Sequence, residues 1–164
     1  MKKIVFHTSG NYAPLALRLL LSIVLFPHGA QKLFGWFGGF GFEGSMGYFT
    51  QDVGLPWIVG FTVIIIEFFG PVFLVIGLGT RIWSIGIIAN MTGIIATTFN
   101  DFIFMNWFGS QKTEGYEFFL LAIGMALSLV ISGGGKYSID SMLTRQPSNR
   151  LKDVGSAPNQ LQTN

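Results

Sequence analysis

The chain has 164 residues and a mass of 18.0 kDa, a length that is typical of one domain. Half of the residues are hydrophobic, only 11% are charged and the mean hydropathy is +0.54, which argues against both a soluble globular protein and a disordered chain. Cysteine is absent, which excludes disulfides, thiolate metal sites, iron–sulfur clusters and CxxC redox pairs. The net charge of +2 provides no basic face for a nucleic-acid partner.

Four apolar segments dominate the chain: residues 14–34, 57–78, 81–101 and 114–132. Each is long enough to cross the roughly 30 Å hydrocarbon core of a bilayer as a helix. The segments do not alternate in polarity, they are too long for strands, and lipid does not tolerate an open sheet edge. We therefore predict an all-α fold, a bundle of four transmembrane helices. Residues 78–80 form so short a connection that the second and third helices are expected to be antiparallel neighbours.

The first segment also has some features of a cleaved signal peptide. Lys2 and Lys3 precede it, but Arg18 interrupts it and no small-residue cleavage site follows. We therefore expect it to be retained. Residues 1–13 are expected to form an N-terminal tail and residues 14–140 the membrane domain. The polar residues 141–164 are expected to form a disordered tail.

The distribution of Lys and Arg predicts how the helices are oriented. One side of the four-helix arrangement carries seven basic residues: Lys2, Lys3, Arg81, Lys136, Arg145, Arg150 and Lys152. The other side carries only Lys32 and Lys112. Both termini are therefore expected in the cytoplasm. Trp36, Trp57 and Trp107 then lie at the outer interface, as in an aromatic belt.

Each predicted helix carries one stripe of polar or small residues at about 100° per residue. The stripes contain, helix by helix, Arg18, Ser22, His28 and Lys32; Gly60, Glu67, Pro71 and Leu74; Gly86, Asn90, Gly93, Thr97 and Asp101; and Glu117, Gly124 and Ser128. Small residues let helix backbones approach closely. We therefore expect packing seams at five of these positions: Gly60, Gly86, Gly93, Gly124 and Ser128.

Ionisable side chains in these stripes are candidate functional residues, because a charge at the bilayer centre costs about 2.5–3.5 kcal/mol on insertion scales. The candidate polar interior comprises Arg18, His28, Lys32, Glu67, Asn90, Asp101 and Glu117. Glu67 lies deep in its helix and must be paired or protonated, with His28 and Asn90 as partners at similar depth. Lys32 and Glu117 can pair near the outer edge. A functional role and a purely structural role stay open for Glu67 and His28.

Arg18 lies about 6 Å from the inner end of its helix and can reach the inner interface by snorkelling. His7 and His28 lie toward opposite faces, so they cannot ligate a haem together, and no other metal-ligand spacing is present. No GxSxG pattern occurs. The Gly-rich residues 35–42 lack a following Lys-Ser/Thr pair and are not a phosphate loop. We expect them to form a flexible outer loop.

Aromatic residues cluster in this outer loop and in the third loop. They are Trp36, Phe37, Phe40, Phe42, Tyr48 and Phe49 in the first, and Phe99, Phe102, Phe104, Trp107 and Phe108 in the second. They can anchor the chain at the interface, or they can form an apolar mouth over His28, Lys32, Asp101 and Glu117. Such a mouth suits a flat lipophilic ligand such as a quinone.

Several motifs together resemble the DoxX family of small bacterial membrane proteins, over residues 14–140. They are Arg18, Pro27-His28-Gly29-Ala30-Gln31-Lys32-Leu33-Phe34-Gly35, Glu67-x-x-Gly70, Gly77-Leu78-Gly79-Thr80-Arg81, Asn90-Met91, Gly115-Tyr116-Glu117 and Ser138-Ile139-Asp140. The resemblance implies a four-helix integral membrane protein of the bacterial plasma (inner) membrane. The family is often described as oxidoreductases, and some relatives are linked to thiosulfate, quinone or catechol chemistry or associate with separate redox enzymes.

The chain offers no redox-active side-chain site of its own, so electron transfer requires a bound organic molecule or a partner protein. One hypothesis is a redox-linked protein in which His28 and Lys32 bind quinone carbonyl oxygens and Glu67 or Glu117 handles protons. The other is a protein without enzymatic activity. It would be an assembly partner of a redox enzyme or a small proton-coupled carrier that uses Glu67, the carrier as a homo-oligomer.

Overall fold

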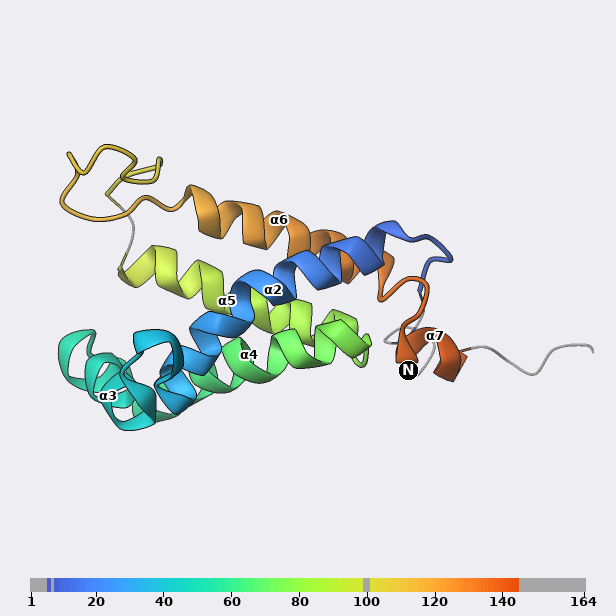
Figure 1. Ribbon diagram of the computed structural model, residues 1–164, viewed down its shortest axis with the longest axis horizontal. Coiled ribbons are helices and arrows are strands. Elements are labelled where there is room, and N and C mark those ends of the chain that lie inside the picture. Colours follow the sequence, from blue (N-terminus) through green and yellow to red (C-terminus); the bar gives the residue numbers. More distant parts are fainter. Residues whose placement is uncertain (1–5, 7, 99–100, 145–164) are drawn as a thin grey trace, which may run out of the picture.

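The computed structural model describes residues 6, 8–98 and 101–144, and every regular element in this part of the chain is helical (Figure 1). Four long helices are α2 (Ala13–Phe34), α4 (Trp57–Ile76), α5 (Thr80–Thr97) and α6 (Glu117–Ser132). Short helices are η1 (Trp36–Gly38), α3 (Gly41–Gly47), η2 (Tyr48–Asp52) and α7 (Ile139–Thr144). The all-α prediction is confirmed, and each long helix lies within a few residues of its predicted range.

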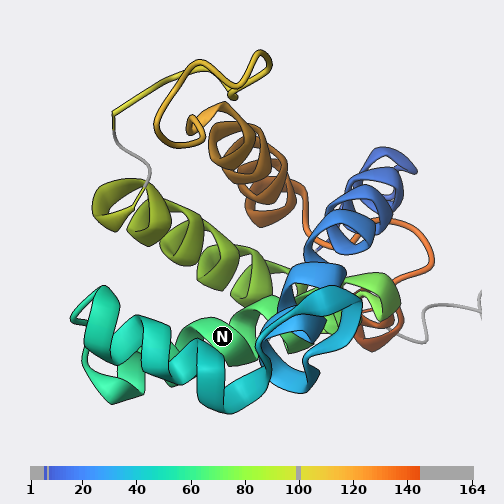
Figure 2. The ribbon, with the colours of Figure 1, turned by 60° about the vertical axis from the view of Figure 1, so that its left-hand side comes forward.

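The four long helices form a ring. α2 packs most extensively on α4 and α5 on α6, while contacts between α4 and α5 and between α2 and α6 complete the ring (Figure 2). Gly77 and Gly79 connect α4 to α5 with φ values of 69° and 62°, a backbone conformation that glycine adopts without steric cost. The second and third predicted helices are therefore antiparallel neighbours, as expected.

The hydrophobic core draws on all four long helices. It consists of Leu21, Leu25, Leu74, Ile87, Met91, Ala122, Ala126 and Leu129. Leu74 and Leu129 lie near the end of the bundle that carries the α4–α5 hairpin, and we call this the closed end. Toward the opposite end, which carries α3, a smaller cluster of Met46, Phe49 and Ile64 packs under the short helices.

Two of the described helices, α2 and α4, are long and apolar enough to cross a membrane by length and composition. The third helix, α5, has 18 residues, but buried Ser84 and Asn90 are polar. The fourth helix begins at Glu117 instead of residue 114, so its 16 residues span only about 24 Å. The outward-facing side chains of the bundle are nevertheless apolar: Ile23, Leu121 and Ile131 are 69%, 69% and 72% exposed.

The structure differs from the flexible loop predicted for residues 35–42, because most of residues 36–52 are helical. They fold into η1, α3 and η2, which pack against the ends of α2 and α4 (Figure 1). Gly39 lies so close to the last turn of α2 that an added Cβ would overlap the backbone of Gln31. A glycine-rich sequence has no helical periodicity to read, so this close packing against α2 was not predictable from spacing.

The predicted glycine seams are confirmed only in part. A Cβ at Gly60 would touch Phe49, and one at Gly86 would touch Ile66, so both positions are packed. Gly93 and Gly124 are exposed, and a Cβ at either would meet nothing within 4 Å. Ser128 is exposed too. Helical spacing predicts that the residues of one stripe share a face of their helix, but it does not predict whether that face packs against another helix.

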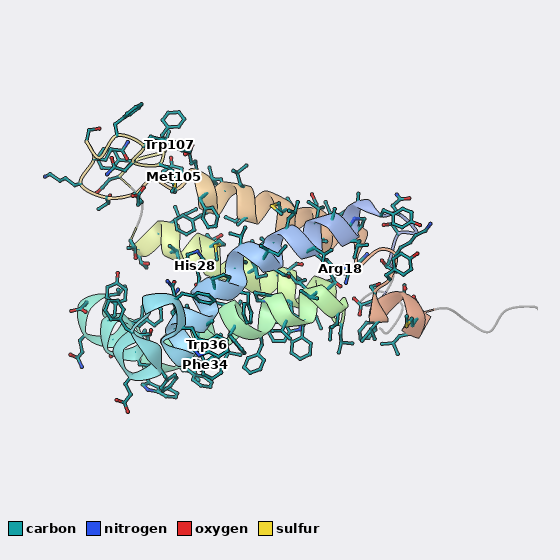
Figure 3. All side chains as sticks on the ribbon, viewed as in Figure 1. Arg18, His28, Phe34, Trp36, Met105 and Trp107 are labelled. Carbon is teal, nitrogen blue, oxygen red and sulfur yellow. The ribbon has the colours of Figure 1, made fainter. Side chains whose placement is uncertain are left out.

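Arg18 is fully buried and joins three segments at the closed end of the bundle (Figure 3). Its Nη1 donates to the carbonyl oxygens of Leu74 and Val75 at 3.0 and 3.2 Å, and its Nη2 to those of Lys136 and Tyr137 at 3.3 and 3.4 Å. The expectation that Arg18 snorkels to the interface is wrong. The guanidinium instead binds carbonyl groups in the last turn of α4, and the Leu74 carbonyl accepts from the Gly77 N–H as well.

Asp140 holds the same end from α7. It is 1% exposed and accepts hydrogen bonds from the backbone N–H groups of Gly79 and Thr80 at 2.8 and 2.9 Å. A carboxylate at this position satisfies free donors and complements the dipole at the start of α5. The Asp140 N–H also donates to the Gly77 carbonyl at 3.0 Å. α7 thereby fixes the α4–α5 hairpin.

Candidate functional site: a polar triad beside a cavity

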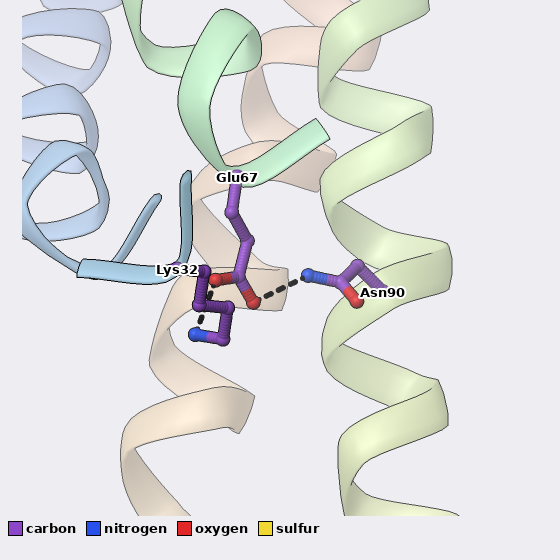
Figure 4. A network of polar contacts seen from close by, with 3 residues as sticks. All are labelled: Lys32, Glu67 and Asn90. Carbon is purple, nitrogen blue, oxygen red and sulfur yellow. Dashed lines mark hydrogen bonds and ion pairs between the residues drawn. The ribbon is translucent and has the colours of Figure 1, made fainter. Parts of the chain in front are cut away.

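Three helices bring one polar side chain each to the middle of the bundle (Figure 4). Glu67 on α4 is 3% exposed, and its Oε2 lies 2.6 Å from the Nζ of Lys32 on α2. Its Oε1 accepts a hydrogen bond from the Asn90 amide on α5 at 2.9 Å. Both carboxylate oxygens are therefore paired, as a nearly buried charge requires.

Close packing of α2 on α4 positions this triad. Pro71 lacks an N–H, so the Glu67 carbonyl four residues earlier has no helical donor. Gly29 faces this carbonyl so closely that a Cβ would overlap it. Lys32 lies one helical turn after Gly29 and on the same face, which places its ammonium beside the Glu67 carboxylate. The Ser22 hydroxyl adds a hydrogen bond to the Pro71 carbonyl at 2.9 Å.

The predicted pair between Lys32 and Glu117 is wrong, because Lys32 pairs with Glu67. The Oε1 of Glu117 instead accepts hydrogen bonds from the Met105 N–H at 3.0 Å and the Trp107 Nε1 at 3.3 Å. Glu117 therefore ties the third loop to the first turn of α6. Nothing in the sequence spacing distinguishes these two arrangements, because the path of the third loop decides between them.

A cavity of about 550 Å³ lies between all four long helices, beside the triad. It is lined by Leu25, His28, Lys32, Tyr48, Phe49, Val63, Glu67, Met91, Ile94, Thr98, Met105, Glu114, Gly115, Phe118 and Phe119. The size falls within the range of about 300–1,000 Å³ that is usual for small-molecule sites. The walls are mainly aliphatic and aromatic, and charged groups come from α2, α4 and the segment before α6.

His28 contributes an imidazole to this cavity without a hydrogen bond to any described residue. It is therefore not the partner of Glu67, whereas Asn90, the other expected partner, is confirmed. Figure 3 places His28 in the half of the bundle away from Arg18. An imidazole nitrogen can donate or accept a hydrogen bond, so His28 is available to a ligand in the cavity.

Of the seven candidates from sequence, the structure brings His28, Lys32 and Glu67 to the cavity. Asn90 does not line this cavity but donates a hydrogen bond to Glu67. Asp101 is exposed and does not line this cavity, and neither does Glu117. Arg18 belongs to the closed end.

The predicted aromatic mouth is also only partly formed. Tyr48 and Phe49 line the cavity, whereas Trp36, Phe37 and Phe40 are exposed, and Phe99 lies outside the described residues.

Sequence reasoning missed several cavity residues on α5 and α6, among them Met91, Phe118 and Phe119. The sequence contains only an indirect indication that these apolar side chains line a cavity, because they share a helix face with Asn90 or lie beside Glu117. Glu114 was missed too. It lines the cavity while its Oε2 accepts a hydrogen bond from the Asn106 N–H at 2.9 Å.

Two smaller cavities adjoin the main one. One, of about 310 Å³, lies between α4 and α5, and the other, of about 290 Å³, lies between the end of α2 and the short helices. Tyr48 and Phe49 line all three cavities. The residues of the triad also line these spaces. Asn90 lines the cavity between α4 and α5, and Glu67 lines the main cavity. Lys32 lines both the main cavity and the cavity beside the short helices.

Comparison with known proteins gives one match. The DoxX family model matches residues 13–100, which include Arg18, the motif around His28 and Lys32, Glu67 and Asn90. The match ends before Gly115 and Asp140, so the resemblance in those later motifs stands on the sequence alone. No curated protein and no solved structure matches the chain. With more than half of its length matched and apolar helices exposing hydrophobic side chains, the chain belongs to the DoxX family and is a membrane protein.

Proposed function

We propose that this DoxX-family protein crosses the bacterial plasma membrane four times and binds a quinone in the cavity between its helices, as the membrane component of a redox system. The cavity carries the proposal: it is mainly apolar, it holds about 550 Å³, and it presents His28 together with the Lys32–Glu67 pair. A flat ring with carbonyl oxygens needs this combination of apolar walls and a few hydrogen-bond donors.

Different residues of the cavity contact different parts of the quinone. The His28 imidazole and the Lys32 ammonium are donors for the carbonyl oxygens of the ring. Phe118 and Phe119 on α6 supply aromatic surface. Glu67 keeps Lys32 in place through the ion pair. Reduction to the quinol takes two electrons from a separate redox enzyme and two protons from water, and the protons are added at the two carbonyl oxygens.

Four spans and cytoplasmic termini fit the same arrangement. The start of α2 and all of α7 lie at one end of the bundle, beside the α4–α5 hairpin, as an even number of spans requires (Figure 1). Arg81 and Lys136 belong to this end, whereas Lys112 lies in the third loop at the other. Much of the expected cytoplasmic charge, including Lys2, lies outside the described residues.

The test is quinone binding by the purified protein in lipid nanodiscs. We expect quinone to be extracted with the wild-type protein and to bind saturably on titration. His28→Leu and Lys32→Met should each weaken binding by about fivefold to tenfold, the loss of one hydrogen bond. Lys112→Met is the matched control, because Lys112 is exposed in the third loop, and it should bind as the wild type does. Absence of saturable binding to the wild type contradicts the proposal.

A second candidate function is a proton-coupled carrier, and the burial of Glu67 favours it. A carboxylate that is 3% exposed, pairs with a lysine and faces a cavity is the kind of ionisable group that marks ion and proton pathways in membrane proteins. Uptake into liposomes that is lost in Glu67→Gln, without quinone binding, would support the carrier. A stable complex with a redox enzyme, without quinone binding, would support an assembly partner.

A further inference from the structure

The space between α4 and α5 differs from the main cavity in its chemistry. The two helices are joined at the hairpin and diverge away from it (Figure 1), and a groove of about 310 Å³ lies between them. Exposed Ile58 and Val59 lie on its outer side, where the bundle would meet lipid.

Three polar side chains of the groove already have hydrogen-bond partners for their donors. The Thr62 hydroxyl donates to the Ile58 carbonyl at 2.7 Å, and the Thr97 hydroxyl donates to the Gly93 carbonyl at 2.9 Å. The Asn90 amide is bonded to Glu67. A hydrocarbon chain can therefore occupy the groove without leaving these donors unpaired.

The groove adjoins the ligand cavity along a shared wall. Five residues line both spaces: Tyr48, Phe49, Val63, Ile94 and Thr98. The two spaces are thus separated by the thickness of single side chains. A molecule that places a polar ring beside His28 and Lys32 can therefore extend past these shared side chains into the groove.

We infer that the α4–α5 groove is the subsite for the hydrocarbon tail of the ligand whose ring occupies the main cavity. This inference rests on the proposed quinone site. It narrows the ligand class to quinones that carry a long prenyl or alkyl tail. The ring lies beside the donors His28 and Lys32 of α2, and the tail leaves between Val63 and Ile94 along the apolar groove to the bilayer.

Gly93 provides the test. It lines the groove on α5, is exposed, and has nothing within 4 Å of an added Cβ, so Gly93→Phe fills the groove without a backbone clash. Gly124 on α6 is also exposed and also has nothing within 4 Å of an added Cβ, but it lines none of the three cavities, so Gly124→Phe is the matched control. Gly93→Ala is a milder variant that keeps most of the groove open.

The probes are a tail-less dimethoxy-methyl benzoquinone and the same ring with a long prenyl tail, titrated into protein in nanodiscs of fixed lipid composition. We expect Gly93→Phe to bind the tailed quinone about tenfold more weakly or worse, since excluding about two methylenes from a buried site has that effect. The affinity of Gly93→Phe for the tail-less quinone should stay within about twofold of wild type. Gly93→Ala should lose less affinity for the tailed quinone than Gly93→Phe does.

The outcomes separate the two proposals. If the wild type binds neither quinone, the proposed function itself fails. If the wild type binds the tail-less quinone but Gly93→Phe binds the tailed one as the wild type does, the tail subsite is wrong and the ring site stands. An equal loss in Gly124→Phe also overturns the subsite, because the effect would then not depend on the groove.

Discussion

At the scale of single residues, the polar side chains of this protein divide into two groups with different environments. Arg18 and Asp140 bond only to backbone groups at the closed end of the bundle, as far as the described residues show. Lys32 and Glu67 bond to each other beside a cavity. The first arrangement fixes helix ends and the second faces a space where a ligand fits. We therefore propose structural roles for the first pair and binding roles for the second.

Removal of the Lys32 ammonium should destabilise the folded protein through Glu67. Lys32→Met leaves one oxygen of a nearly buried carboxylate unpaired, which costs about 1–3 kcal/mol, reduced by whatever screening the 28% exposed Lys32 side chain receives. The double variant Lys32→Met with Glu67→Leu should recover most of the loss, because no unpaired charge remains. Denaturant unfolding in detergent measures both. Strictly additive losses would show that the pair is not coupled.

The closed end should affect stability without affecting the cavity. Arg18→Lys replaces a planar fork that reaches four carbonyl groups by a single ammonium, so we expect a clear decrease in unfolding temperature. Asp140→Asn loses one of two cap acceptors and should cost about 0.5–2 kcal/mol. Quinone affinity of the folded fraction should stay unchanged in both variants. A tenfold loss of affinity with normal stability would place Arg18 or Asp140 in the ligand site instead.

At the scale of elements, the contact between α2 and α4 decides whether the triad forms. Gly29→Ala inserts a methyl group into the backbone of Glu67 and Phe68, and such overpacking costs roughly 1–3 kcal/mol. Separation of the helices would also weaken the Lys32–Glu67 pair. Gly93→Ala is the control, since its Cβ has free space, and the better helix propensity should stabilise it by about 0.5–1 kcal/mol. Equal effects of the two substitutions would contradict the close approach.

Helix ranges could be predicted well from sequence and helix neighbours less well. Long apolar runs bounded by Pro14, Gly79 and Gly133 mark the four long helices, because proline and glycine interrupt helices for local reasons. The depth of Glu67 and Asn90 along their helices predicted that they could meet. The partner of Lys32 could not be predicted, because Glu67 and Glu117 lie on different helices and only tertiary packing brings one of them close.

The cavity itself was not visible in the sequence. Its walls include apolar side chains such as Met91 and Phe118, whose pattern is the same whether a helix faces a packed core or an empty space. Gly93 and Gly124 illustrate the same limit, since both read as packing positions and both are exposed. Periodicity identifies a face, whereas the neighbour of that face depends on how the helices are arranged.

At the scale of the whole molecule, the account requires four spans with both termini inside. The chain has no cysteine, so each single-cysteine variant carries one thiol. We expect Ser110→Cys, in the third loop, to react with a membrane-impermeant maleimide in intact cells. Leu143→Cys on α7, which is 62% exposed, should react only after permeabilisation. Labelling of both positions in intact cells would contradict the account, because the single span between them places them on opposite sides of the membrane.

The most direct test of the central claim is to locate a bound quinone. A photoreactive quinone, incorporated in nanodiscs with the wild-type protein and activated by light, can be mapped by mass spectrometry of the labelled peptides. The account predicts labels on cavity residues such as Met91, Phe118 and Phe119, removed by an excess of unlabelled quinone. Labels confined to lipid-facing residues such as Leu121 and Ile131, or labels that excess quinone does not displace, would contradict it.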